Sequence, residues 1–174
     1  MYIVDKTLNT HFNTWVQDFH VIFFKVESIK FSASNTSYHV IVLSYSSSTT
    51  PKGLTAPLVL GASGSDGCTN EVYDNLHVEG KIVLVQRGVC PDGTTLVGRI
   101  KPGAAAGAAA VIIYSDVVTP VTGGTLSNPN LEEYVSSDYI NKADGEPLVA
   151  RLQAGEAIEV YFQQTQNRRD KNHT

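Results

Sequence analysis

The chain has little of what marks nucleic-acid-binding or membrane-spanning proteins. Its 13 lysines and arginines are outnumbered by 17 aspartates and glutamates, which gives a formal net charge of −4. Nucleic-acid binding normally needs a basic patch, and the one basic cluster, Arg168, Arg169 and Lys171, fits a solvated tail better. The apolar run Val21 to Phe24 is far shorter than the roughly 20 residues that cross a bilayer. We therefore expect no nucleic-acid partner and no membrane partner.

Cysteine is also scarce, with only Cys68 and Cys90 in 174 residues, so a disulfide-dense scaffold is excluded. The two can form one bridge or remain two buried thiols. Glycosylation sequons that begin at Asn35 and Asn172, together with the serine- and threonine-rich stretch 44–55, favour a secretory origin. On that basis we predict a Cys68–Cys90 bridge, worth about 3 kcal/mol of loop entropy, and a secreted location.

Charged residues make up only 17% of the chain and hydrophobic residues 42%, a globular composition that fits one domain with short extensions. The first nine residues lack the basic start, apolar middle and cleavage site of a signal peptide. Met1 is then read as an expression start on a piece of a longer protein.

The clearest pattern lies in the centre of the sequence. The continuous apolar run within Lys81–Gln86 predicts a strand that is buried on both faces. A helix is expected over Thr95–Ala110, kinked or shortened by Pro102, followed by a second buried strand at Val111–Tyr114. Together these make a βαβ unit at 81–114 with a right-handed crossover.

The flanking segments show weaker patterns. Short helices are expected at 2–12 and at 141–152, the second beginning at Asn141 or at Pro147 and ending at Gly155. Further strands are expected at 15–24, 26–31, 38–45, 56–60 and 157–162, and a polar tail at 163–174.

The segment Asp116–Ser137 is long and irregular, and loops of this length inside a compact domain often carry function. It can equally be a decorated surface loop. Together with the apolar Val21 and Phe23 of the early strand, it supplies the candidate interaction residues. In this loop these are Asp116, Thr119, Asn128, Glu132 and Tyr134.

No catalytic constellation stands out. A zinc site needs ligands in a set geometry, yet no two histidines have i, i+4 spacing; they are His11, His20, His39, His77 and His173. The segment Gly61–Ser65 does not match the G-x-S-x-G nucleophile elbow. We therefore expect no catalytic residue, no metal ligand and no cofactor in this chain.

Two blocks carry a family resemblance. GKIVLVQRGVC at Gly80–Cys90 and AGAAAVIIY at Ala106–Tyr114 resemble the two halves of the central signature of protease-associated domains. The segment LSYSSST at 43–49 is similar to a stretch of secreted fungal leucine aminopeptidases and the related vacuolar aminopeptidase. The likeness extends outward to the lead-in at 2–24 and the last helix. Its main departure is Cys90-Pro91-Asp92-Gly93, where the family has a helix-friendly stretch.

The resemblance implies an α+β, β-rich fold: an open barrel or sheet flanked by short helices. It implies a lead-in at 1–55 that abuts a catalytic domain, a protease-associated domain at 56–162, and a polar tail or linker at 163–174. The parent would be a secreted, or alternatively vacuolar, two-zinc aminopeptidase whose zinc ligands lie beyond this chain.

Three functions compete. The first is a non-catalytic accessory domain acting in substrate access or protein contact, with the catalytic domain in cis as its partner. The second is a stand-alone protease-associated protein that binds a peptide, a protein or a glycan through the 116–139 loop. The third is an enzyme complete in this chain. Without a catalytic domain, the apolar lead-in strand would be exposed and would favour self-association.

Overall fold

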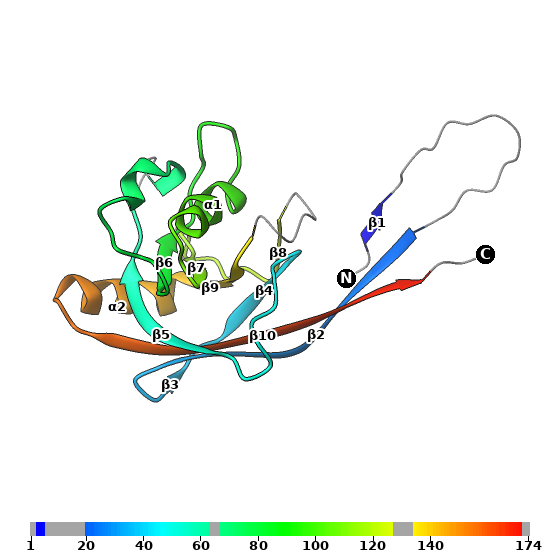
Figure 1. Cartoon of the computed structure of the whole chain (residues 1–174), viewed down its shortest axis with the longest axis horizontal. Helices are drawn as coiled ribbons and strands as arrows, with labels where there is room; N and C mark the ends of the chain where they lie inside the picture. Colours follow the sequence, from blue (N-terminus) through cyan, green and yellow to red (C-terminus); the bar gives the residue numbers. More distant parts are fainter. Residues whose placement is uncertain (1–2, 6–19, 63–66, 127–133, 172–174) are drawn as a thin grey trace, which may run out of the picture.

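The structure is a computed structural model that describes residues 3–5, 20–62, 67–126 and 134–171, with side chains described within 33–165 of these ranges. Its core is a mixed sheet that curls into a half-barrel with two short helices, the predicted α+β class (Figure 1). The strands lie in the order β1-β2-β10-β5-β6-β7-β9-β4-β8, with β3 paired to β2.

The element bounds are, in chain order, β1 Ile3–Asp5, β2 His20–Ala33, β3 Thr36–Ser37, β4 Val40–Ser44, β5 Leu54–Leu60, the 3-10 helix η2 Glu71–Tyr73, β6 Ile82–Gln86, α1 Val97–Ala105, β7 Ala110–Tyr114, β8 Gly124–Thr125, β9 Ser136–Ile140, α2 Lys142–Gln153 and β10 Ile158–Lys171.

The predicted βαβ unit is present, because β6 and β7 pair in parallel around α1. Alternate residues of β6 enter different cores, as period two requires. Ile82 and Leu84 join one core with Leu148 of α2, whereas Val83 and Val85 join the other with Ile100 of α1. Both faces of these strands are thus covered, which explains their uninterrupted apolar sequence.

Helix α1 is shorter than the predicted 95–110. It runs through Pro102 and ends at Ala105, with Gly107 just beyond it at a φ of 84°, a left-handed conformation that glycine adopts readily. Helix α2 begins after Asn141, so the alternative start at Pro147 is wrong; Pro147 lies inside the helix. Gly155, with a φ of 82°, follows its end as predicted.

Several expected boundaries are corrected. Residues 3–5 of the expected N-terminal helix are strand β1, which pairs with β2. The strands expected at 15–24 and 26–31 are one strand from His20 onward, since β2 is continuous. The expected long loop contains β8 and the start of β9. The rest of the helix expected at 2–12, and residues 15–19, lie outside the described residues.

The largest correction concerns the expected tail at 163–174. Strand β10 continues to Lys171 and pairs with β2 from Val160 to Lys171, whereas its pairing with β5 covers only Ile158–Phe162. From Gln166 onward, β2 and β10 form a ribbon that extends from the body of the domain, and β1 pairs with the far end of β2 (Figure 1). The pairing register shifts between Thr165 and Gln166, so the ribbon begins at a β-bulge.

Candidate functional site

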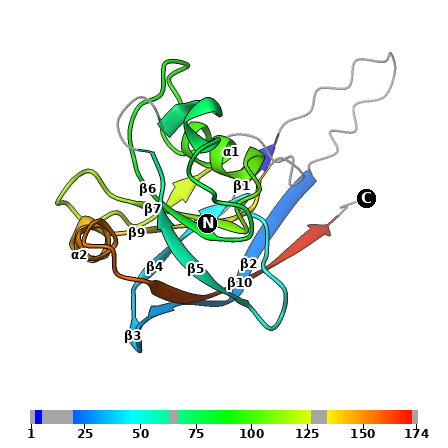
Figure 2. The ribbon, with the colours of Figure 1, turned by 60° about the vertical axis from the view of Figure 1, so that its left-hand side comes forward.

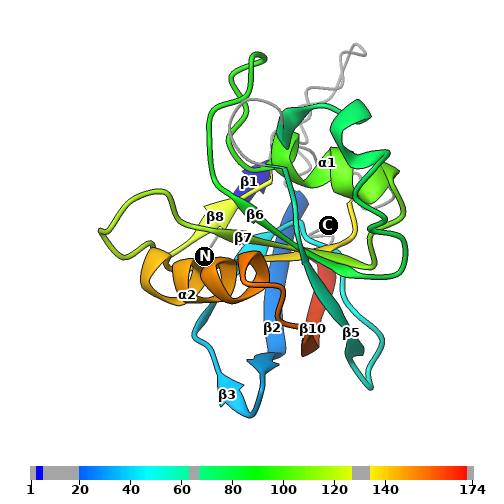
Figure 3. The ribbon, with the colours of Figure 1, turned by 90° about the vertical axis from the view of Figure 1, so that its left-hand side faces the viewer.

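Four neighbouring strands, β5, β6, β7 and β9, run parallel. Their carboxyl ends therefore meet at one edge of the sheet, the position where ligands bind in open α/β sheets. We name this region the carboxyl edge. It consists of the loop after β6 (residues 87–94), the loop after β7 (115–123), and Asn141 and Lys142 after β9. The loop after β7 stands out from the body (Figure 2 and Figure 3).

Two cations converge on one residue of this edge. Nη1 of Arg87 lies 3.0 Å from Oδ1 of Asp116, and Nζ of Lys142 donates to the backbone oxygen of Asp116 at 3.3 Å. Lys142 also lies 3.5 Å from Oε1 of Glu146, one helical turn further on. Pairs this exposed contribute little to stability. Their effect is to join the loop after β7 to the loop after β6 and to α2.

Side-chain hydrogen bonds hold the loop after β7 at both ends. The Ser115 hydroxyl accepts from the Val117 amide at 3.1 Å and donates to the Val117 carbonyl at 2.9 Å. Where the loop returns, the Val121 amide donates to Oδ1 of Asn141 at 3.1 Å. Asn141 was predicted as a possible helix cap, and it occupies that position, but its side chain makes no capping hydrogen bond to α2.

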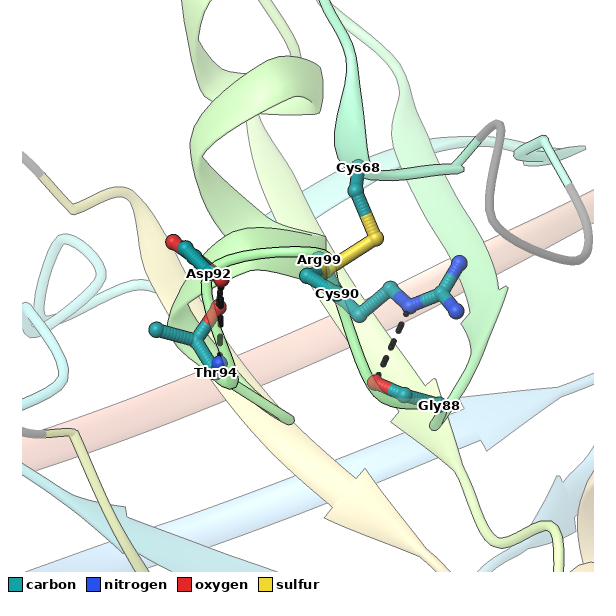
Figure 4. The surroundings of a disulfide bond; sticks show 6 residues. All are labelled: Cys68, Gly88, Cys90, Asp92, Thr94 and Arg99. Carbon is teal, nitrogen blue, oxygen red and sulfur yellow. Dashed lines mark hydrogen bonds between the residues drawn. A yellow bond between two sulfur atoms is a disulfide. The ribbon is translucent and has the colours of Figure 1, made fainter.

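The loop after β6 is held by a disulfide and by an arginine (Figure 4). Cys68 and Cys90 are joined, as the sequence predicted. Nε of the buried Arg99, on α1, lies 3.4 Å from the Gly88 carbonyl, to which it donates a long hydrogen bond. Burial lowers the pKa of Arg99.

The turn that follows closes on itself. Oδ1 of Asp92 accepts from the Thr94 hydroxyl at 2.7 Å and from the Thr94 amide at 3.0 Å. These bonds lower the pKa of Asp92. The turn takes the place of the helical stretch that the family signature has here, so the departure noted in the sequence is a closed loop.

Three valines project from these two loops. Val89 is 68% exposed, Val117 44% and Val118 84%, and within the described residues they are the exposed large hydrophobic side chains. The edge therefore combines exposed apolar groups with the Arg87–Asp116 ion pair and the exposed carboxylate of Asp92.

The structure separates the predicted interaction residues. Asp116 and Thr119 lie on the carboxyl edge, but Tyr134 is buried at 4% exposure. Asn128 and Glu132 lie outside the described residues. Val21 and Phe23 lie on β2, paired with Lys171 and Arg169 of β10, beyond the part of the chain whose side chains are described. The segment 116–139 is thus not one surface.

Of the sequon asparagines, Asn35 is exposed in the tight turn between β2 and β3, with a φ of 63°, and Asn172 lies outside the described residues. The sequence reading missed Arg87, Val89, Val117, Val118 and Lys142 as candidate site residues. Position alone could have indicated them, because they follow buried parallel strands or open the helix after one.

Within the described ranges, no three side chains of histidine, cysteine, aspartate or glutamate gather as a metal site would require. His39 and His77 are both exposed, and Nδ1 of His77 lies 3.0 Å from the Asn75 carbonyl. The described helices also include none that is long and apolar enough to cross a membrane.

The fold and the signature blocks define a protease-associated module, and the PA domain model matches residues 54–148, more than half of the chain. The chain belongs to the PA domain family.

A bacterial and a fungal protein are similar to this chain in sequence. The probable lipoprotein aminopeptidase LpqL of Mycobacterium tuberculosis is 36% identical over 126 residues, 72% of this chain and 24% of the relative. The probable leucine aminopeptidase 2 of Aspergillus fumigatus is 34% identical over 121 residues, 68% of this chain and 22% of the relative.

Solved structures agree on the fold. The aminopeptidase from Aneurinibacillus sp. strain AM-1 superposes with a TM-score of 0.74 at 24% identity, covering 97% of this chain and 36% of its own. BSAP, a zinc aminopeptidase from Bacillus subtilis, gives a TM-score of 0.57 at 25% identity, covering 83% and 33%. The chain thus spans about a quarter of the curated relatives it matches. Both bacterial and fungal proteins match, so the fungal subtype is not singled out.

Proposed function

We propose that this chain is a non-catalytic accessory domain of a secreted zinc aminopeptidase, joined in cis to a catalytic domain whose substrate access or protein contacts it affects. The matched parts of its aminopeptidase relatives amount to about a quarter of their length, which suits an accessory module. In this proposal the zinc belongs to the catalytic domain, and the PA domain holds no cofactor.

The observation that carries the proposal is how the first and last described strands meet. Val4 of β1 and Lys171 of β10 both pair with Val21 of β2, one on each side. Adjacent strands lie about 4.8 Å apart, so the chain enters and leaves the ribbon within about 10 Å. A module with neighbouring entry and exit strands can be inserted into a host domain without disturbing it.

The ribbon is the proposed contact with the catalytic domain. Apart from the short strand β1, the ribbon consists of two strands, and two isolated strands are marginally stable in water. The β2 sequence from Val21 to Phe24 is wholly apolar. Without the catalytic domain, we expect the 174-residue chain to self-associate through Val21 and Phe23. Small-angle scattering over a concentration series measures this, and a monomer at high concentration contradicts it.

Activity and reading frame test the accessory role separately. The purified chain should not hydrolyse amino-acid p-nitroanilides with or without added zinc, and mass spectrometry should find no bound zinc. The genomic reading frame should continue into a region with zinc ligands. Zinc-dependent turnover by the 174-residue chain would overturn the proposal.

A stand-alone secreted PA protein that binds a peptide, protein or glycan is the second candidate, favoured by the exposed valines of the carboxyl edge. A reading frame without a peptidase region supports it. For either candidate, a secreted or vacuolar location is supported by the Cys68–Cys90 bridge and the exposed Asn35. Expression in a secreting eukaryotic host should give a glycan mass that Asn35→Gln removes, with Asn172→Gln as the companion variant.

A further inference from the structure

Buried polar groups connect two strands that are not neighbours in the sheet, β9 and β10. Asp138 of β9 and Gln164 of β10 are both fully buried. Alternation along each strand places them on the same face as Ile140 and Phe162, which share one hydrophobic core. Oδ2 of Asp138 and Nε2 of Gln164 have no hydrogen-bond partner within the part of the chain that the structure describes. Buried polar groups that are satisfied only in part are costly, and they call for an explanation.

The connection runs through residues 43–49, which we name the connector. From residue 43 onward, β4 leaves β9 and pairs with the two-residue strand β8. Two residues of β9 hold the connector by hydrogen bonds. Oδ1 of Asp138 accepts from the Leu43 amide at 3.3 Å, and the Ser137 amide donates to the Ser46 hydroxyl at 2.7 Å.

At its other end the connector holds Gln164. The Ser46 hydroxyl donates to Oε1 of Gln164 at 3.2 Å. The Thr49 amide donates to the Gln164 carbonyl at 2.9 Å, and the Gln164 amide donates to the Thr49 hydroxyl at 3.0 Å. The bulge at which the ribbon begins lies just beyond Gln164. The connector thus joins the carboxyl group of Asp138 to the root of the ribbon.

No described cation offsets a charge on Asp138. Strands β4, β5 and β6 carry no ionisable residue. The ionisable residues on the other elements around this core face are Tyr114 on β7, Glu27 as the extra residue of β2 at the bulge, and Lys142, Asp144, Glu146 and Arg151 on α2. The two cations of α2 are paired with glutamates, Lys142 with Glu146 and Arg151 with Glu156.

We propose that Asp138 is a pH-sensitive switch: when protonated it holds the connector, and when ionised it releases the connector and the root of the ribbon. A carboxylate at this depth has one described donor, the Leu43 amide, and an unpaired buried charge is costly. Water reaches it where β4 leaves β9. The bond from the Ser47 hydroxyl to the Tyr134 carbonyl, 2.7 Å long, opens with the connector, and the ribbon is then free to turn about its bulge. The switch lies within this chain and does not depend on the accessory role.

The direction of the switch follows from burial, which raises the pKa of Asp138 well above its ordinary value against the opposing effect of the Leu43 amide. The connector is therefore held in acid and released as the pH rises. The window lies between the pKa of an exposed aspartate, about 4, and the raised pKa of the folded state. Within it, an opening that exposes Asp138 becomes easier by up to about tenfold per pH unit, and an opening that leaves Asp138 buried does not respond.

Hydrogen exchange of the 174-residue chain from about pH 4 to about pH 8, corrected for the intrinsic pH dependence of amide exchange, tests the switch. The reporters are the Leu43 amide, which donates to Asp138, and the amides of Thr49 and Gln164 at the far end of the connector. We expect the protection of all three to fall by up to about tenfold per pH unit in that window. Asp138→Asn should keep their protection constant. Glu159→Gln, on an exposed residue of β10, should respond like the wild-type chain.

Ser46→Ala separates the two ends of the connector. It removes the hydroxyl that joins β9 to Gln164 and leaves the contact between Asp138 and Leu43 in place. Carbon-13 NMR should still show the Asp138 carboxyl titrating, and Leu43 should still respond to pH. The Gln164 amide should lose at least about tenfold of its protection in acid and no longer respond. Ser48→Ala, on an exposed residue of the connector, is the matched control and should change none of these readouts.

Three results would overturn the switch. Constant protection of Thr49 and Gln164 in the wild-type chain, with a response at Leu43 alone, would confine the effect to the contact that Asp138 makes itself. Equal protection of Gln164 and of Val83, a fully buried residue of β6, at every pH would mean that only global unfolding responds. An unchanged response in Asp138→Asn would assign the pH dependence to another group. The wild-type series decides the first two outcomes even where a variant does not fold.

Discussion

Asp138 is the most unusual residue of the sheet because it is a fully buried carboxyl group on a central strand. Strand β4 pairs with β9 only as far as Val42 opposite Asp138, and from Leu43 it pairs with β8. Oδ1 of Asp138 accepts from the Leu43 amide at 3.3 Å, whereas Oδ2 has no partner among the described residues. The side chain thus takes over a backbone pairing where β4 leaves β9.

Burial raises the pKa of Asp138 well above its usual range, against the opposing effect of the Leu43 amide. The folded state therefore keeps a proton that the unfolded state loses above about pH 4. The stability that this group contributes is present below the unfolded pKa and is lost as the pH rises through the folded pKa. Denaturant unfolding should show the wild-type free energy falling by up to about 1.4 kcal/mol per pH unit in that window.

Asp138→Asn should remove this pH dependence, because an amide does not titrate and can still accept from Leu43. Glu159→Gln, on an exposed residue of β10, is the matched control and should leave the slope unchanged. The same slope in the Asp138→Asn and wild-type chains would show that Asp138 is ionised in the folded protein.

Gly88 is required by packing and not by backbone conformation. A β-carbon at this position would overlap the guanidinium of the buried Arg99, whose Nε lies 3.4 Å from the Gly88 carbonyl. Gly88→Ala should destabilise the domain by about 1 to 3 kcal/mol, the usual result of overpacking. Denaturant unfolding measures the loss.

The control for this prediction is Gly123→Ala. A β-carbon at Gly123 meets no atom within 4 Å, and its φ is not positive, so this change should be nearly neutral. If the two alanine variants are equally stable, Arg99 can move without cost and its position does not constrain the loop.

At the scale of elements, the disulfide connects the segment before η2 to the loop between β6 and α1, and its cysteines are 22 residues apart. Replacing both by serine frees the unfolded chain and should lower the free energy of unfolding by about 3 kcal/mol. Reduced wild-type protein should unfold at the denaturant concentration of the double variant. Equal stability of the oxidised and reduced forms would contradict the entropic argument.

The sequence predicted the central elements because their own residues are apolar enough to show that they are buried. Strands β6 and β7 are apolar on both faces, and the helix between them must cover one face. Strand β9 was missed because it reads Ser136-Ser137-Asp138 at its start, yet all three residues are buried. Their burial depends on hydrogen bonds to distant residues, such as the Ser137 amide to the Ser46 hydroxyl at 2.7 Å. No local pattern records such partners.

The distal part of β10 was missed for a similar reason. Gln163 to Lys171 is polar, so its composition predicted a tail, but it is a strand because β2, more than 130 residues earlier in the chain, pairs with it. The candidate site was predicted only in part. Asp116 and Thr119 were chosen because they lie in a long loop. The partners of Asp116 come from the loop after β6 and from α2, and only the topology of the sheet brings them together.

The whole molecule has two parts that differ in cohesion. In the body, the neighbouring strands β5, β6, β7 and β9 have one hydrophobic core on each face. Helix α1 packs into one core and helix α2 into the other. In the ribbon, beyond Phe162, β10 pairs with a described strand on one side only, and that strand is β2. A segment with one hydrogen-bonded neighbour opens at a lower free energy than one with two.

Hydrogen exchange should therefore divide β10 at its bulge. Amides of Val160 and Phe162 should exchange slowly, near the global unfolding limit, because β10 there has β2 and β5 as neighbours and both side chains are fully buried. Amides from Gln166 to Lys171 should exchange at least about a hundredfold faster, through local opening. In the arrangement proposed above, a catalytic domain in cis should protect the ribbon and leave the body unchanged, because the proposed contact covers only the ribbon. Uniform protection along β10 in the 174-residue chain would mean that the ribbon is stable without a partner, and the argument for its docking in cis would lose its physical basis.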